Sequence, residues 1–178
     1  MTDTDTTVAP TARHDRWTHL NITLHWLIVV LLIAQFFDSE WMGPLFDASN
    51  EGKSATGATL ILGYTHMILG GLIFLAIALR LWDRQTHGRP AHRSGEPGWA
   101  SSLARLTHAA LYALLFAMPI AGAAAWFTGS ETVATLHKWG WTALMIVAAL
   151  HVVGALAEHF WFRTDVLRRM MPGQGRSS

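Results

Sequence analysis

Cysteine is absent from this chain of 178 residues. Without a thiol, the protein can form no disulfide, ligate no iron–sulfur cluster, build no zinc ribbon and attach no haem covalently. Charged residues are also scarce, at 14% of the chain, whereas soluble domains carry roughly 25%. Any bound metal must therefore be held by histidine, methionine, carboxylate or a prosthetic group, and the low charge indicates a membrane protein.

Long apolar stretches make up much of the sequence. Hydrophobic residues account for 51% of the chain, and its mean hydropathy is +0.27. Each stretch reaches or nearly reaches the roughly 20 residues that cross the hydrocarbon core of a bilayer. The stretches are apolar nearly all round, unlike the half-polar helices of a water-soluble bundle. We therefore predict an all-α fold, an integral membrane four-helix bundle, with spans at approximately Trp17–Phe37, Ala58–Leu81, Leu103–Thr128 and Val133–Phe162.

The two ends of the chain differ from this apolar body. Residues 1–16 are polar and show no apolar periodicity, which predicts a disordered tail. Residues 166–178 are basic and form a predicted C-terminal tail. The transmembrane domain is accordingly placed at residues 17–165.

Lysine and arginine are distributed unevenly between the two sides of the predicted bundle. Cytoplasmic segments of membrane proteins carry an excess of these residues. If the N-terminus is inside, only Lys53 and Lys138 lie outside. The loop expected after the first span is acidic and carries Asp38, Glu40, Asp47 and Glu51. The arginines then lie inside: Arg13, Arg16, Arg80, Arg84, Arg89, Arg93, Arg105, Arg163, Arg168, Arg169 and Arg176. Both termini are therefore predicted to be cytoplasmic.

The last span carries three histidines, His137, His151 and His159. Imidazoles are costly to bury in hydrocarbon, so ionisable residues within spans indicate function. His137 and His151 are fourteen residues apart in the sequence. They lie within roughly 40° of each other on one helix face and roughly 21 Å apart along the axis. One face thus presents an imidazole toward each side of the membrane, as expected of a helix that holds two haems one above the other.

Histidines on two other spans lie at matching depths. The second span runs in the same direction as the fourth, so His66 lies near the outer face with His137. The first span runs the opposite way, which puts His25 near the cytoplasmic face with His151. We predict an outer haem site ligated by His66 and His137 and an inner one ligated by His25 and His151. Two axial imidazoles suit electron transfer, because no iron position is left open for oxygen.

His108 is an alternative ligand for the inner site. It lies near the cytoplasmic start of the third span and could take the place of His25. We favour His25 because it completes a symmetrical arrangement with the fourth span. A single buried histidine is more often a hydrogen-bonded structural residue. Four histidines at matched depths on three spans favour haem ligation over that interpretation.

Further polar residues lie near the predicted inner site. Arg80 is fourteen residues after His66 and could pair with a haem propionate, since arginine binds carboxylates bidentately. A snorkelling interfacial arginine is the alternative. Glu158 could form a quinone head-group site with His159 and Trp161, in which titratable groups deliver protons as electrons arrive. A solvated helix end is the alternative interpretation there.

These motifs resemble the bacterial cytochrome b561 family over nearly the whole chain after the tail. The similarity rests on LHW at His25, YTHMILG at His66, RLTHAALYALLFAMPIAG at His108, LHKWG and LHVVGALAEHFWF in the last span, and RRMMP near the C-terminus. Members are four-helix proteins of the bacterial inner membrane, and the resemblance implies that location and two haems b here. Related b-type subunits of formate dehydrogenases and nickel–iron hydrogenases take two ligands from the last helix and one from each of the first two. This supports His25, His66, His137 and His151 as ligands.

Within the family, the sequence is most similar to the stand-alone member that acts as a superoxide oxidase. The resemblance implies an enzyme that takes electrons from superoxide at the periplasmic face and passes them to ubiquinone near the cytoplasmic face. Lys138, directly after His137, and Lys53 are the outer cations that could attract the superoxide anion, although two cations among four acidic groups steer it only weakly. Glu158 departs from that member, which has a histidine at this position, so the geometry of the quinone site is expected to differ.

A second hypothesis is a cytochrome b electron-transfer subunit that links a partner dehydrogenase or hydrogenase to the quinone pool. It requires a docking surface for that partner, which the short outer loops do not reveal. A purely structural or transport bundle is a third reading, but it does not account for the depth-matched histidines. The expected partners are quinone, superoxide or a redox protein, and the lipid bilayer, with no nucleic acid. The oligomeric state is left open.

Overall fold

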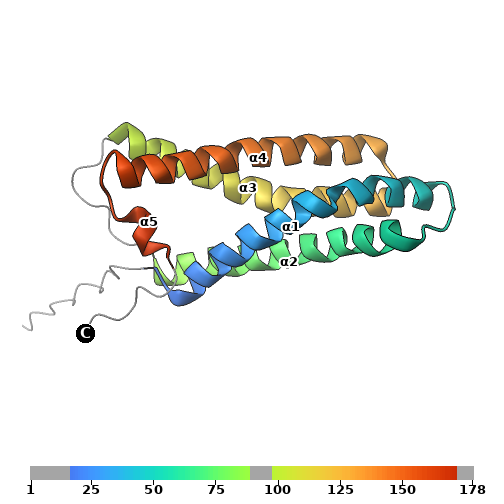
Figure 1. Ribbon diagram of the computed structural model, residues 1–178, viewed down its shortest axis with the longest axis horizontal. Helices are drawn as coiled ribbons and strands as arrows, with labels where there is room; N and C mark the ends of the chain where they lie inside the picture. The colour runs from blue at the N-terminus through green and yellow to red at the C-terminus, as the bar shows by residue number, and fades with distance from the viewer. Residues whose placement is uncertain (1–16, 89–97, 172–178) are drawn as a thin grey trace, which may run out of the picture.

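The computed structural model describes residues 17–88 and 98–171. The predicted tail at 1–16, part of a connector at 89–97 and the end of the chain at 172–178 lie outside the described residues. The described part is all-helical (Figure 1), as predicted. Its elements are α1 (His19–Asn50), α2 (Gly57–His87), α3 (Gly98–Thr128), α4 (Glu131–Phe160) and the short α5 (Val166–Arg169).

Helices α1 to α4 are long and apolar enough to cross a membrane. They run side by side along the long axis of the molecule (Figure 1). The start of α1, the end of α2, the start of α3 and the end of α4 lie together with α5; we call this the terminal end. The opposite end carries the α1–α2 and α3–α4 connections, and we call it the loop end.

The helix starts carry clear local signals. Thr18 precedes α1, and its hydroxyl accepts a hydrogen bond from the backbone N–H of Asn21 at 3.0 Å. Ser130 caps α4 in the same way through the N–H of Val133. Such caps satisfy backbone donors that have no partner within the helix. Gly129 has a φ of 63°, which permits the tight turn between α3 and α4 at the loop end.

Helix α1 is longer than the apolar run that predicted it. The first span was expected to end at Phe37 and to be followed by an acidic loop, but α1 continues to Asn50. Asp38 is therefore helical rather than in a loop, and only 5% of its surface is exposed. Hydropathy marks where a helix leaves hydrocarbon, not where its backbone hydrogen bonds end. Leu45 and Phe46 extend the helix by packing inward, at 4% and 8% exposure.

The same correction applies to the other acidic residues of that expected loop. Glu40 and Asp47 also lie within α1, and only Glu51 follows it. The last helix shows the reverse difference, because α4 ends at Phe160 rather than at Phe162.

The helices pack mainly as neighbours in sequence. The most extensive backbone contacts join α1 to α2 and α3 to α4, with a smaller set between α2 and α3. Helix α4 otherwise makes its extensive contacts with α5. Leu144 is the only buried side chain of α4. The core is an apolar cluster on the other three helices and Leu144: Leu24, Ile28, Leu31, Ile73, Ala76, Ile77, Leu115, Met118 and Leu144.

Large apolar side chains cover the outside of the bundle. They occur on all four long helices and include Val30, Phe37, Ile61, Phe127 and Leu150. A water-soluble monomer rarely exposes apolar surface on this scale. These faces are suited to contact with lipid.

Packing between α1 and α2 yields a stability prediction at two glycines of α2. A Cβ at Gly63 would collide with the side chain of Leu45, whereas a Cβ at Gly71 would meet nothing within 4 Å. Gly63→Ala should therefore lower the free energy of unfolding by about 1–3 kcal/mol, the usual cost of overpacking. Thermal unfolding in detergent measures this, with Gly71→Ala as the matched control. Equal melting temperatures for the two variants would contradict the close α1–α2 approach.

Candidate functional site

Five histidines gather into two groups, one at each end of the bundle. The first group joins α2 to α4 near the loop end through the rings of His66 and His137, whose centroids are 6.3 Å apart. The second lies near the terminal end, where His25 of α1 and His151 of α4 have centroids 6.2 Å apart. His108 of α3 belongs to this second group. The structure thus brings together the two pairs predicted from depth.

The first pair is oriented by acceptors behind each ring. Nδ1–H of His66 donates to Oδ1 of Asp38 at 2.9 Å, and Nδ1–H of His137 donates to the carbonyl of Met118 at 3.0 Å. With the proton on Nδ1, the lone pair of Nε2 is available to a metal. Gly122 leaves room for the ring of His137, since a Cβ there would lie 3.1 Å from its Cε1.

The second pair has a different neighbour. Nη1 of Arg80 donates to Nδ1 of His25 at 2.6 Å. A guanidinium has no acceptor, so in this arrangement the proton of a neutral His25 ring lies on Nε2. Ligation through Nε2 therefore requires Arg80 to move off Nδ1 or the ring to give up that proton. The second pair is less fully prepared for a metal than the first.

Arg80 is anchored by a polar network at the terminal end. Its Nε donates to Oδ1 of Asn21 at 3.2 Å. Nδ2 of Asn21 donates to Oδ2 of Asp83 at 3.1 Å and to the carbonyl of Arg80 at 3.3 Å. The Thr18 hydroxyl donates to the same oxygen of Asp83 at 2.6 Å. Asn21 and Asp83 are both buried, so the network fixes α1 against α2 and holds the guanidinium beside His25.

The rings of His108 and His151 lie closer together than the two rings of either predicted pair. The two ring centroids are 5.0 Å apart, and Nδ1–H of His108 donates to the carbonyl of Ala104 at 2.6 Å. This bond within α3 leaves Nε2 of His108 with its lone pair, as ligation would need. Two imidazoles on opposite sides of one metal need centroids roughly 6 to 6.5 Å apart, given metal–nitrogen bonds of about 2.0 Å. The spacing favours His25 over His108 as the partner of His151.

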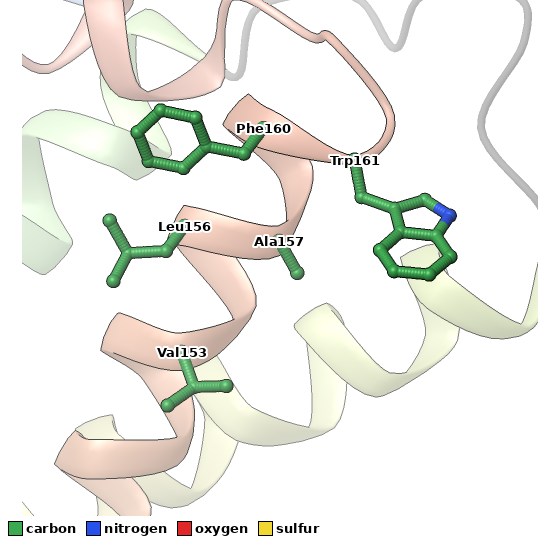
Figure 2. A pocket seen from close by; sticks show the side chains of 5 residues that line it. All are labelled: Val153, Leu156, Ala157, Phe160 and Trp161. Atoms are coloured by element: carbon green, nitrogen blue, oxygen red, sulfur yellow. The ribbon is translucent and has the colours of Figure 1, made fainter.

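The residues predicted to form a quinone site are not gathered around one described cavity. Glu158 is half-buried, and its Oε2 accepts from the Thr164 hydroxyl at 3.2 Å. Nδ1 of His159 is buried with no hydrogen-bond partner. A shallow apolar groove of about 390 Å³ is lined by Val153, Leu156, Ala157, Phe160 and Trp161 (Figure 2). Of the three predicted residues, only Trp161 lines this groove. At about 100° per residue, the groove lies on the face of α4 opposite His151.

The two lysines at the loop end differ in their surroundings. Lys138 is exposed on α4, directly after His137. Lys53 forms an ion pair with Glu51 at 2.5 Å. Within the described ranges, Lys138 is therefore the lysine whose charge is not offset by a neighbouring carboxylate.

Comparison with known proteins assigns the chain to a family. The family described as prokaryotic cytochrome b561 matches residues 16–173. The chain belongs to the prokaryotic cytochrome b561 family. It is 29% identical to "Cytochrome b562" of Cereibacter sphaeroides over 87% of this chain and 94% of that protein. It is 25% identical to "Cytochrome b561 homolog 2" of Escherichia coli over 92% and 94%, and 23% identical to "Cytochrome b561 homolog 1" over 89% and 98%.

As a member of the cytochrome b561 family, the chain is a multi-pass bacterial membrane protein that transfers electrons and binds haem b. In the described residues, no group of three or more His, Asp or Glu side chains could hold a metal ion alone. The histidines instead form pairs with centroids 6.2 and 6.3 Å apart. Both distances match the roughly 6 to 6.5 Å expected between two imidazoles that bind one metal from opposite sides. In a haem, that metal is the iron at the centre of the flat macrocycle. Both spacings are therefore those expected around haem b, and at the second pair Arg80 would first have to leave Nδ1 of His25 or the ring would have to lose its Nε2 proton.

Helix packing agrees with this fit. Directly packed helices lie roughly 8–10 Å apart, which leaves no room for a flat macrocycle between them. The paired imidazoles join α4 to α1 and to α2, whereas the extensive contacts of α4 are with α3 and α5. The close backbone contacts of α4 are thus not with α1 or α2, the helices that carry the partner histidines.

Sequence reasoning missed several residues that orient the histidines. The hydropathy pattern places Asp38 in a loop, and it does not single out Met118 or Asn21. A signal was present in α1, where the buried residues follow a three-to-four spacing: Asn21, Leu24, Ile28, Leu31, Gln35 and Asp38. Such spacing places all of them on one helix face. The polar members of that face could therefore have been expected to point inward.

Proposed function

We propose that this chain holds two haems b and transfers electrons from superoxide at the periplasmic face to ubiquinone near the cytoplasmic face. His66 and His137 are the proposed ligands of the outer haem, and His25 and His151 those of the inner one. The observation that carries the proposal is the presence of two imidazole pairs with nearly equal centroid spacings, 6.3 and 6.2 Å. When bound between two imidazoles, haem b supplies one-electron transfer and has no iron position open to oxygen.

The orientation proposed here places the loop end in the periplasm and both termini in the cytoplasm. Among the described residues, Arg84, Arg105 and Arg168 lie on segments of the terminal end. Lys53 and Lys138 lie on loop-end segments. This distribution supports the orientation because cytoplasmic segments are enriched in Lys and Arg.

Lys138 is the proposed attraction point for superoxide. It is exposed and adjacent in sequence to His137, so it places a positive charge beside the outer pair. Superoxide needs only to approach closely, since it gives up one electron and leaves as dioxygen without binding iron. Two superoxide ions supply the two electrons that, with two protons, convert ubiquinone to ubiquinol.

Quinone reduction is assigned to the cytoplasmic end of α4. Glu158 and His159 are the proposed proton-delivering groups, and the apolar groove that includes Trp161 gives the quinone tail a membrane-facing surface. Arg80 is the proposed partner of an inner haem propionate. Its remaining guanidinium N–H groups can serve that role while Nε stays on Asn21.

Haem content tests the ligand assignment. His66→Ala or His137→Ala should each lower the haem content by half, and His25→Ala or His151→Ala should remove the other half, because each deletion leaves one axial position empty. The haem-to-protein ratio of the purified variants measures this, with the exposed His19→Ala of α1 as the control. If His108→Ala removes a haem while His25→Ala keeps both, the inner assignment is wrong.

The superoxide reaction is tested on oxidised protein supplied with ubiquinone. A superoxide source should reduce the haems, which is followed by the change in their absorbance. Quinol should then form, and superoxide dismutase should block both reactions. Lys138→Ala should slow haem reduction several-fold, more at low salt, because exposed charges are screened by ions. Lys53→Ala is the matched control, since that lysine is paired with Glu51. Haems that respond to dithionite but not to superoxide would indicate a partner-dependent electron carrier instead.

The quinone assignment is tested by Glu158→Gln. The amide can still accept a hydrogen bond from Thr164 but cannot carry a proton as a carboxylate does. Quinol formation should slow while both haem spectra stay unchanged. Glu131→Gln, an exposed substitution at the other end of α4, is the control. Unaltered quinol kinetics in the Glu158 variant would remove Glu158 from the proposed site.

A further inference from the structure

The two histidine pairs face side chains of opposite charge. Behind His66 lies the carboxylate of Asp38, 2.9 Å from Nδ1. Behind His25 lies the guanidinium of Arg80, 2.6 Å from Nδ1. Each charge touches the ring on the nitrogen that would not bind the metal. One end of the bundle is thus electrostatically negative at its ligand, and the other is positive.

The negative charge at Asp38 is directed at His66 alone. Asp38 is 5% exposed, and its second oxygen, Oδ2, is buried without a hydrogen-bond partner. No lysine or arginine of the described chain forms an ion pair with it, and His66 is the donor it has there. Gln35, one turn earlier on α1, adds a second buried acceptor, Oε1, that also lacks a partner. No neighbouring cation therefore offsets the carboxylate charge.

The positive charge at Arg80 is equally local. Its guanidinium donates to His25 and to Asn21, and the carboxylate of Asp83 reaches this network only through the Asn21 amide. Among residues 17–88 and 98–171, no carboxylate forms a direct ion pair with Arg80, so the one direct carboxylate partner proposed for it is the propionate of the inner haem itself. Asn21 holds Nε in place, so the charge stays near the pair if Nη1 turns away from His25.

These charges bear on the reduction potential of a haem at each site. A carboxylate that accepts from a ligating imidazole raises the basicity of that ligand and stabilises the more positive, oxidised iron. Asp38 therefore lowers the potential at the first pair. A nearby cation stabilises the reduced iron, so Arg80 raises the potential at the second. Both effects are strengthened by the low dielectric of a membrane interior.

We propose that Asp38 and Arg80 set the order of the two potentials, low at the His66–His137 pair and high at the His25–His151 pair. The proposal rests on the two-haem function proposed above. One electron enters from a donor at the outer face, superoxide in that function. A haem held by His66 and His137 would pass this electron to one held by His25 and His151, and a quinone would accept it at the terminal end. Electrons then run from the loop end to the terminal end.

Potentiometric titration of the purified, haem-loaded protein tests this, with each haem followed by its absorbance. The component missing in His66→Ala identifies the outer site. Asp38→Asn should shift the reduction equilibrium of that component about tenfold toward the reduced form, which raises its potential by ~59 mV for one electron. The potential of the other component should not change. Arg80→Gln should lower the other component by a similar factor. Asp38→Glu and Arg80→Lys keep the charges and should largely preserve both potentials.

Glu40→Gln is the control for the loss of an acidic charge, because Glu40 is exposed on α1 two residues after Asp38. It should leave both potentials in place. Two haems whose potentials do not respond to Asp38→Asn and Arg80→Gln, or an outer component that titrates above the inner one, would overturn the inference. If Asp38→Asn expels the outer haem, the comparison of Arg80→Gln with Arg80→Lys decides it. Wild-type protein with fewer than two haems would instead overturn the proposed function.

Discussion

An imidazole placed among apolar helices needs a partner for each ring nitrogen, and this requirement governs much of the structure. Where hydrocarbon replaces water, an unpaired donor costs free energy that nothing nearby offsets. His66 and His137 meet the requirement on one side through Asp38 and the Met118 carbonyl. Their Nε2 atoms are left to bind something else. The metal of a haem b held between them, as proposed, would satisfy both at once.

The small number of buried side chains on α4 agrees with the same requirement. A helix that presents imidazoles at two depths to two other helices cannot also pack its apolar side chains closely against them. Leu144 is accordingly its only buried side chain, and its close contacts are with α3 and α5. Haem b, which the family binds, would supply the contact surface that α4 lacks.

Hydropathy and spacing predicted the four helices and the proximity of His66 to His137 and of His25 to His151, because both depend on local regularities of the chain. They misplaced Asp38, since a window average registers a carboxylate as the end of a span. Its true position follows from the three-to-four spacing that continues the buried face of α1 through Gln35. The contact between Arg80 and His25 was beyond the sequence, because it depends on how α1 and α2 are rotated against each other. The groove at Trp161 could not be predicted for a different reason, because it lies on the face of α4 that carries no histidine.

The charge asymmetry between the two ends does not depend on which molecule donates the electron. If superoxide is the donor, Lys138 is the one cation argued to attract it, in a loop end that also carries Glu40, Asp47 and Glu51. Attraction of the anion to the loop end is then weak. The carboxylate behind His66 and the guanidinium behind His25 would favour oxidation at the loop end and reduction at the terminal end with either donor. A partner protein docked at the loop end would deliver electrons down the same gradient, whereas flow from quinol outward would run against it.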